Sequence, residues 1–120
     1  MPFLARAPVA VVAAIHIYIL NLEMFLWTTP RSLKAFGMTP EYAAKTAPLA
    51  ANQGLYNGFL AAGLIWGLAH PQVEVGNQIQ LFFLGCVGVA GVYGGLTVKR
   101  TILWIQALPA AVAVGAMLFA

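Results

Sequence analysis

Residues 76–98 read GNQIQLFFLGCVGVAGVYGGLTV and contain no charged side chain. A second uncharged stretch, residues 101–120, follows after only Lys99 and Arg100. One continuous helix over both stretches would be about 67 Å long, which is too long for a single crossing of a ~30 Å hydrocarbon core. The two stretches therefore predict a tight hairpin of two membrane-spanning helices, with the basic pair in the turn.

Two further apolar stretches precede this hairpin, at residues 8–27 and 49–69, and the first carries one charge, Glu23. Each is close to the roughly 20 residues that a transmembrane helix needs. Backbone polar groups must be satisfied internally in lipid, so all four stretches should be helical. The predicted fold class is all-α: a polytopic membrane protein with a four-transmembrane-helix bundle and short loops, forming a single domain over residues 1–120.

Composition supports a membrane protein. Hydrophobic residues make up 62% of the 120 residues and charged residues 8%, against roughly 45–50% and 25% in soluble domains. So short a chain cannot hide that much apolar surface in a core, and it is too apolar to be disordered. The short polar connections offer no nucleic-acid-binding surface. The single Cys86 excludes an intrachain disulfide, and no residue spacing indicates a metal site or a cofactor.

The distribution of Lys and Arg predicts the orientation. Five basic residues lie in the first and third connections, and one lies on the opposite side; they are Arg31, Lys34, Lys45, Lys99 and Arg100, against Arg6. Cytoplasmic loops carry the excess of basic residues in membrane proteins. Both termini are therefore expected outside the cytoplasm, and the two basic connections inside it.

The connection at residues 28–48 is the one long segment between predicted spans. Thr39, Pro40 and Glu41 form a helix-start signal, with Thr39 as N-cap and Pro40 in the first helical position. Apolar and basic residues alternate irregularly here, which is typical of a segment lying among lipid headgroups. Two interpretations remain open for this interfacial loop: an anchor to anionic lipid, or an ordered connector.

Polar side chains inside the apolar stretches are the candidate functional residues, because they are costly in a membrane. His16 and Glu23 are about two helical turns apart on one face, which Trp27 continues. The second stretch carries a polar stripe, and the third and fourth contribute side chains at a similar depth. The candidate ligand- or proton-binding residues are His16, Glu23, Trp27, Asn52, Gln53, Tyr56, Asn57, Tyr93 and Gln106. Together they predict a polar pocket in the cytoplasmic half of the membrane.

Each of these residues also has a structural interpretation. Glu23 would then be a protonated acid that bonds an amide of the second helix, and Asn52, Gln53 and Asn57 would join helices. Gly54 and Gly58 have the spacing of closely packed membrane helices.

Three functions follow from these interpretations: binding or transport of a small polar or cationic solute, a membrane-embedded isomerase acting on a lipidic substrate, or an accessory subunit of a larger membrane complex. The first is favoured. In the isomerase, His16 and Glu23 would be acid and base, although the sequence identifies no catalytic residue. Expected partners are membrane lipids, with a second copy or another complex subunit as alternatives.

Two segments carry a family resemblance. Residues 16–27, HIYILNLEMFLW, and residues 51–61, ANQGLYNGFLA, resemble DUF1304, a family of small bacterial membrane proteins, and so do Tyr93-Gly94 and residues 106–110. The resemblance spans essentially the whole chain and implies a four-helix protein of the bacterial inner membrane with unknown function. Some members carry the label epimerase, which this sequence does not support because it has no strand followed by a GxGxxG loop.

Overall fold

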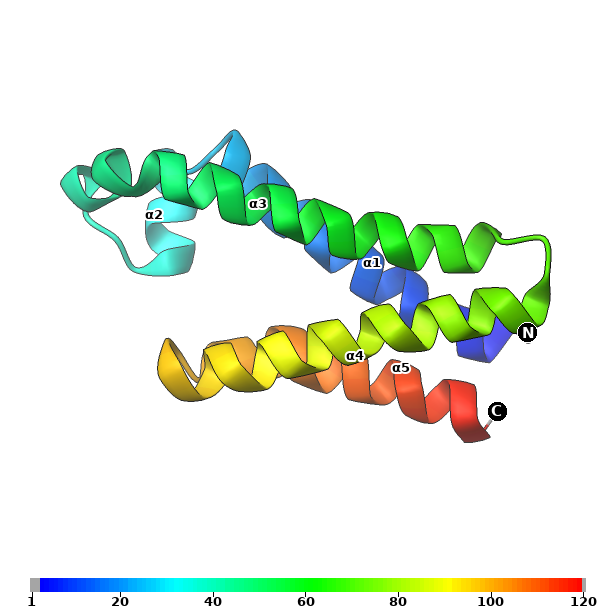
Figure 1. The fold of residues 1–120 in the computed structure, drawn as a ribbon. Coiled ribbons are helices and arrows are strands. Elements are labelled where there is room, and N and C mark those ends of the chain that lie inside the picture. The colour runs from blue at the N-terminus through cyan, green and yellow to red at the C-terminus, as the bar shows by residue number, and fades with distance from the viewer. Residues whose placement is uncertain (1–2, 120) are drawn as a thin grey trace. The chain divides into compact units, whose positions relative to one another are not determined.

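The computed structural model describes residues 3–119, and within them every regular element is helical. The helices are α1 (Phe3–Met24), α2 (Pro30–Phe36), α3 (Pro40–Ala69), α4 (Val73–Thr97) and α5 (Leu108–Phe119), with a π-helical turn η1 (Leu103–Ala107) before α5 (Figure 1). The all-α prediction is confirmed. The last residue of the expected 101–120 helix lies outside the described residues.

The chain divides into two compact units. Unit 1 combines the residues up to Ile15 with those from Leu60 onward, and unit 2 is His16–Phe59. Unit 1 thus holds α4, η1 and α5 with the first part of α1 and the last part of α3. Unit 2 holds α2 with the remainder of α1 and α3.

Two helical segments, Leu4–Met24 and Val73–Thr97, are long and apolar enough to cross a membrane. The expected span at 49–69 lies within α3, whose amides at Asn52, Gln53 and Asn57 lower its hydropathy. The helix over Leu103–Phe119 is apolar but shorter. Length and composition therefore support two spanning helices in the described chain, where the sequence predicted four.

Helix α1 ends earlier than predicted. The amides of Phe25 and Leu26 both donate to Asn21 O, and Thr29 Oγ1 donates to Leu26 O at 2.6 Å, which turns the chain away from the helix. Trp27 therefore lies beyond α1, and the expectation that it extends the Glu23 face is wrong. Pro30 then opens α2, since a fixed φ suits a first helical position.

Residues 28–48 are largely helical, which corrects the expected loop. Gly37 ends α2 in the left-handed conformation, φ 64°, which glycine adopts at little cost. Thr39 Oγ1 accepts a hydrogen bond from the Tyr42 amide at 3.2 Å, so the predicted N-cap is confirmed. Helix α3 then continues through Pro48 to Ala69.

Unit 1 has its own hydrophobic core. The core residues are Val9, Val12, Ala13, Leu64, Leu84, Val87, Ala110 and Ala113.

Side chains bond the backbone carbonyl groups at the end of α3. Gly67 O has no amide partner four residues on, because Pro71 lacks an N–H. Gln80 Nε2 donates to it at 3.1 Å. Arg6 donates to Leu68 O at 2.8 Å, while the Gln72 amide bonds the His70 ring.

The α4–α5 hairpin has the short turn that the sequence predicts. The Lys99 amide donates to Gly94 O, and the Leu103 amide donates to Arg100 O. The two helices approach closely, since a Cβ built on Gly91 would lie 2.5 Å from Ala107 N. The π turn η1 ends at Ala107, two residues before Pro109, whose ring nitrogen cannot donate a helical hydrogen bond.

Candidate functional site

Unit 2 contains a carboxyl–amide pair that joins two helices. Glu23, in α1, is 7% exposed. Asn57 Nδ2, in α3, donates a hydrogen bond to Glu23 Oε1 at 2.6 Å. The structure therefore brings together two residues that the sequence placed at one depth, from segments 34 positions apart.

Glycines on α3 allow this pair to form. A Cβ built on Gly54 would lie 2.6 Å from Met24 Cγ and 3.1 Å from Glu23 Cβ, and one on Gly58 would lie 2.7 Å from Leu20 Cδ1. Small residues of this kind let helix backbones approach in lipid. The short amide side chain of Asn57 can then reach the carboxyl of Glu23.

The other predicted residues of α3 point elsewhere. Asn52, Gln53 and Tyr56 are exposed, and the Tyr56 ring lies 6.0 Å from that of Phe59. Asn57 is half-buried and bonds Glu23. The polar stripe read from the sequence thus divides into one residue that contacts α1 and three that face outward.

His16 is fully buried in α1. It lies seven positions before Glu23, and because α1 is continuous over both residues the predicted two-turn separation holds.

Trp27 belongs to the corner between α2 and α3. Its Nε1 donates to Thr46 Oγ1 at 3.0 Å, and its ring lies 4.8 Å from the Phe36 ring. Thr46 Oγ1 in turn donates to Tyr42 O. Through these contacts, Trp27 holds α2 against α3.

Tyr93 and Gln106 lie in unit 1. Tyr93 is 71% exposed on α4, and its carbonyl accepts a hydrogen bond from Thr97 Oγ1. Gln106 is half-buried in η1, with its Cβ against the close approach at Gly91. That these residues share a layer with Glu23 stays a prediction.

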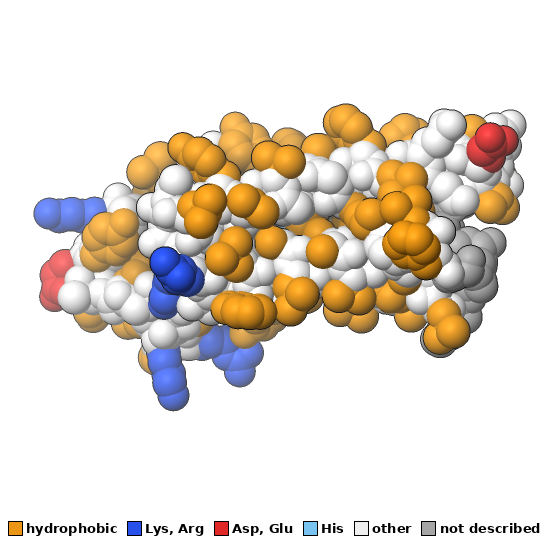
Figure 2. Space-filling view, turned by 90° about the horizontal axis from the view of Figure 1, so that it is seen from below, with side chains coloured by type: hydrophobic (Ala, Val, Ile, Leu, Met, Phe, Trp, Pro, Cys, Tyr) orange, Lys and Arg blue, Asp and Glu red, His pale blue; other side chains and the backbone are white. Residues whose placement is uncertain are grey.

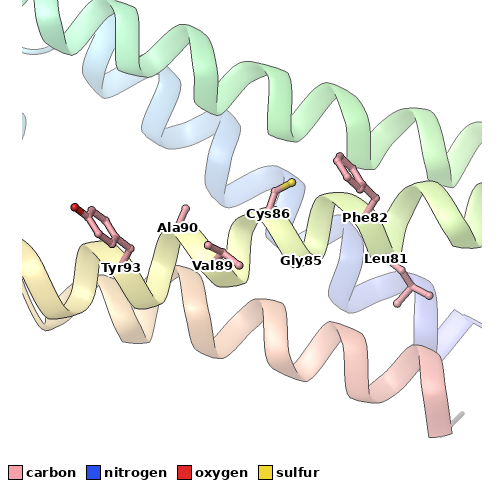
Figure 3. Close-up of a pocket in the computed structure, with 7 residues that line it drawn as sticks. All are labelled: Leu81, Phe82, Gly85, Cys86, Val89, Ala90 and Tyr93. Atoms are coloured by element: carbon pink, nitrogen blue, oxygen red, sulfur yellow. The ribbon is translucent and has the colours of Figure 1, made fainter.

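A shallow open groove of about 750 Å³ runs along α4 (Figure 3). Its lining is apolar: Leu81, Phe82, Gly85, Cys86, Val89, Ala90 and Tyr93. Of the predicted site residues, Tyr93 lines it. A groove with this lining offers apolar contact and few hydrogen bonds, so it differs in character from the polar pocket that the sequence predicts.

Sequence reasoning missed Gln80. This side chain is 1% exposed, and it caps the end of α3 through Gly67 O. Its signal was present, because Gln80 is an amide within the apolar run of α4. Within residues 3–119, no group of three or more His, Cys, Asp or Glu side chains could hold a metal ion.

The fold and this pair define a class: an all-helical protein with two helices that could span a membrane and a buried carboxyl–amide contact between α1 and α3. The model of DUF1304, described as a protein of unknown function, matches residues 10–118, and the chain belongs to that family.

Among curated proteins, the uncharacterized protein YpaA of Lactococcus lactis subsp. lactis is 28% identical to this chain over 99 residues, 79% of this chain and 80% of YpaA. No solved structure matches.

Proposed function

We propose that the protein crosses the bacterial inner membrane four times, with both termini outside the cytoplasm. The segments at 49–69 in α3 and 101–120 would supply the second and fourth crossings, in addition to those of α1 and α4. Only 33% and 28% of the two spanning windows are buried, whereas the core helix of a soluble protein is mostly buried. Large apolar side chains such as Val89 and Leu96 are 72% and 74% exposed, and hydrophobic side chains cover much of the face in Figure 2. Apolar surface of this extent favours lipid contact.

Within that membrane protein, Glu23 and Asn57 bind a small polar or cationic solute for transport. The observation that carries this proposal is the 2.6 Å hydrogen bond between the two side chains. An ionised carboxylate has about four acceptor positions, and Asn57 occupies one of them. A cation or a solute N–H group can use the others, with the Asn57 carbonyl as a further acceptor.

The choice of residue also favours binding. A neutral amide at position 23 would accept the same hydrogen bond from Asn57 without the cost of an ionisable group in an apolar helix. A carboxyl adds a proton that can be exchanged for a cation. Ionisable residues inside membrane segments commonly mark such pathways.

The test uses the purified full chain in mild detergent, with the lipophilic cation tetraphenylphosphonium as probe. We expect saturable binding that weakens about tenfold or more in Glu23→Gln, because a charge-assisted contact is lost. Glu41→Gln is the matched control, since Glu41 is an exposed acid in the first turn of α3. Equal binding by the parent protein and Glu23→Gln would contradict the proposal.

A second candidate is an accessory subunit in which the pair only joins α1 and α3. It is favoured by the fact that the Glu23–Asn57 bond closes within one chain. Native mass spectra of the parent protein and Glu23→Gln separate the two functions. A retained small molecule that the variant loses supports binding, whereas bare protein of equal stability in both supports the accessory role.

A further inference from the structure

The corner formed by residues 25–46 presents an exposed basic surface. Arg31 and Lys34 are exposed and lie three positions apart on α2, a spacing that places them on one side of the helix. Lys45 is exposed in the early part of α3. Glu41 is the one acidic residue of this corner. Figure 2 shows Lys and Arg side chains projecting from the molecular surface.

Positive charges outnumber negative ones on this surface. Arg31, Lys34 and Lys45 form no ion pair with any other residue in the described range 3–119. Three positive charges against one negative charge, that of Glu41 four positions before Lys45 on α3, still leave this short segment with a net positive potential. A negatively charged partner would neutralise it.

The corner is also held in place. The Trp27 ring packs against Phe36, and Trp27 Nε1 bonds Thr46 Oγ1, so one residue contacts both α2 and α3. Ser32, between the two cations of α2, is fully buried. Arg31 and Lys34 therefore extend from a helix that is packed on its other side.

Exposed apolar and aromatic side chains accompany the cations. Phe25, Leu26 and Tyr42 are 69%, 39% and 57% exposed in the same unit. A surface that mixes aromatic, aliphatic and basic side chains matches the boundary between hydrocarbon and headgroups, where Tyr and Trp are enriched. A free anion would make no contact with the apolar members of this surface.

We propose that α2 and the adjoining start of α3 bind the headgroups of anionic phospholipids. Arg31, Lys34 and Lys45 pair with the phosphates, while Phe25, Leu26 and Tyr42 insert beside the first carbons of the acyl chains. This inference rests on the membrane location proposed above and is independent of the solute site at Glu23. It resolves the two interpretations of the 28–48 connection in favour of a lipid contact.

Trp27 provides a local reporter for the test. Trp66 and Trp104 are 57% and 67% exposed, so Trp66→Phe and Trp104→Phe leave Trp27 as the single tryptophan without disturbing a buried site. The full chain is placed in nanodiscs that contain phosphatidylglycerol and phosphatidylcholine, with bromine on the acyl chains of one lipid at a time. Quenching of Trp27 then gives the local ratio of the two lipids.

We expect brominated phosphatidylglycerol to quench more strongly, with an enrichment of about fivefold for each cation that engages a headgroup. High salt should reduce this enrichment, because screening weakens exposed charge pairs. The triple variant R31Q/K34Q/K45Q should lose it. The matched control R31K/K34R/K45R keeps every charge and should retain it.

Three results would overturn the proposal, and they are distinguishable. Equal quenching by both lipids in the parent protein contradicts a preference for anionic headgroups and leaves the membrane location intact. A preference that persists in R31Q/K34Q/K45Q contradicts the assignment to these cations. Absence of quenching by either lipid contradicts the contact of this corner with lipid.

Discussion

At the scale of single residues, the proposed site depends on Glu23 and Asn57. Their hydrogen bond joins α1 to α3, and the acid is 7% exposed. Burying a polar group without a partner is costly, whereas a bonded one is tolerated. The pair thus joins two helices and also provides a carboxyl group that can bind a solute. Substitutions at position 23 can separate these two roles.

Glu23→Gln keeps an acceptor for Asn57 Nδ2, so the free energy of unfolding should change by less than about 1 kcal/mol. Glu23→Ala removes the acceptor and leaves a small cavity, which should cost about 1–3 kcal/mol. Unfolding of both variants in detergent, followed by circular dichroism, gives the difference. Equal destabilisation by Gln and Ala would show that the bond to Asn57 contributes nothing.

At the scale of elements, the end of α3 depends on a side chain from α4. Gln80 supplies Gly67 O with the donor that Pro71 lacks. Gln80→Leu should therefore destabilise the protein by about 1–3 kcal/mol, because a buried carbonyl loses its partner. Gln78→Leu is the control, since Gln78 is exposed on the same helix. Thermal unfolding of the two variants checks this, and similar midpoints would contradict it.

The space around each glycine shows which helix faces are packed against a neighbour and which are open. A Cβ on Gly67 would lie 2.9 Å from Gly76 O and 3.0 Å from Gln80 N, which are backbone atoms that cannot easily move. Gly67→Ala should cost about 1–3 kcal/mol. A Cβ on Gly85 meets no described atom within 4 Å, so Gly85→Ala should stabilise α4 by about 0.5–1 kcal/mol. If Gly67→Ala is tolerated as well as Gly85→Ala, this arrangement of α3 and α4 is wrong.

At the scale of the whole molecule, the central question is how the chain crosses the membrane. In a Cys86→Ser background, single cysteines at the exposed positions Ala35, Gln72 and Thr101 report the side of each connection. A membrane-impermeant maleimide added to spheroplasts should label Gln72→Cys and leave Ala35→Cys and Thr101→Cys unlabelled until lysis. Labelling of Ala35→Cys or Thr101→Cys in intact spheroplasts would contradict the four-span orientation.

Much of the fold could be predicted from sequence, because the length of an apolar stretch and the residues that begin or end a helix are local features of the chain. Thr39 caps α3 as expected, and the α4–α5 turn forms at Lys99 and Arg100. The position of Trp27 could not be predicted, because it depends on the turn at Asn21 and on contacts with Phe36 and Thr46.

The candidate site could also be predicted only in part from the sequence. Helical spacing placed Glu23 near the amides of α3, but it could not decide which amide would meet it. Gly54 and Gly58 decide this, since they allow the closest approach on the face that carries Asn57. Asn52, Gln53 and Tyr56 had the same polarity and are exposed. The role of Gln80 depended on Pro71 and Gly67, a tertiary relation that periodicity does not contain.

The most direct test of the solute site at Glu23 is its modification by dicyclohexylcarbodiimide in membranes. This uncharged reagent adds to protonated carboxyl groups in apolar surroundings, and peptide mass spectra distinguish Glu23 from the exposed Glu41 and Glu74. We predict that Glu23 is labelled preferentially and that tetraphenylphosphonium protects it. Labelling of Glu23 that tetraphenylphosphonium leaves unchanged at saturating concentration would contradict a cation-binding role for this carboxyl.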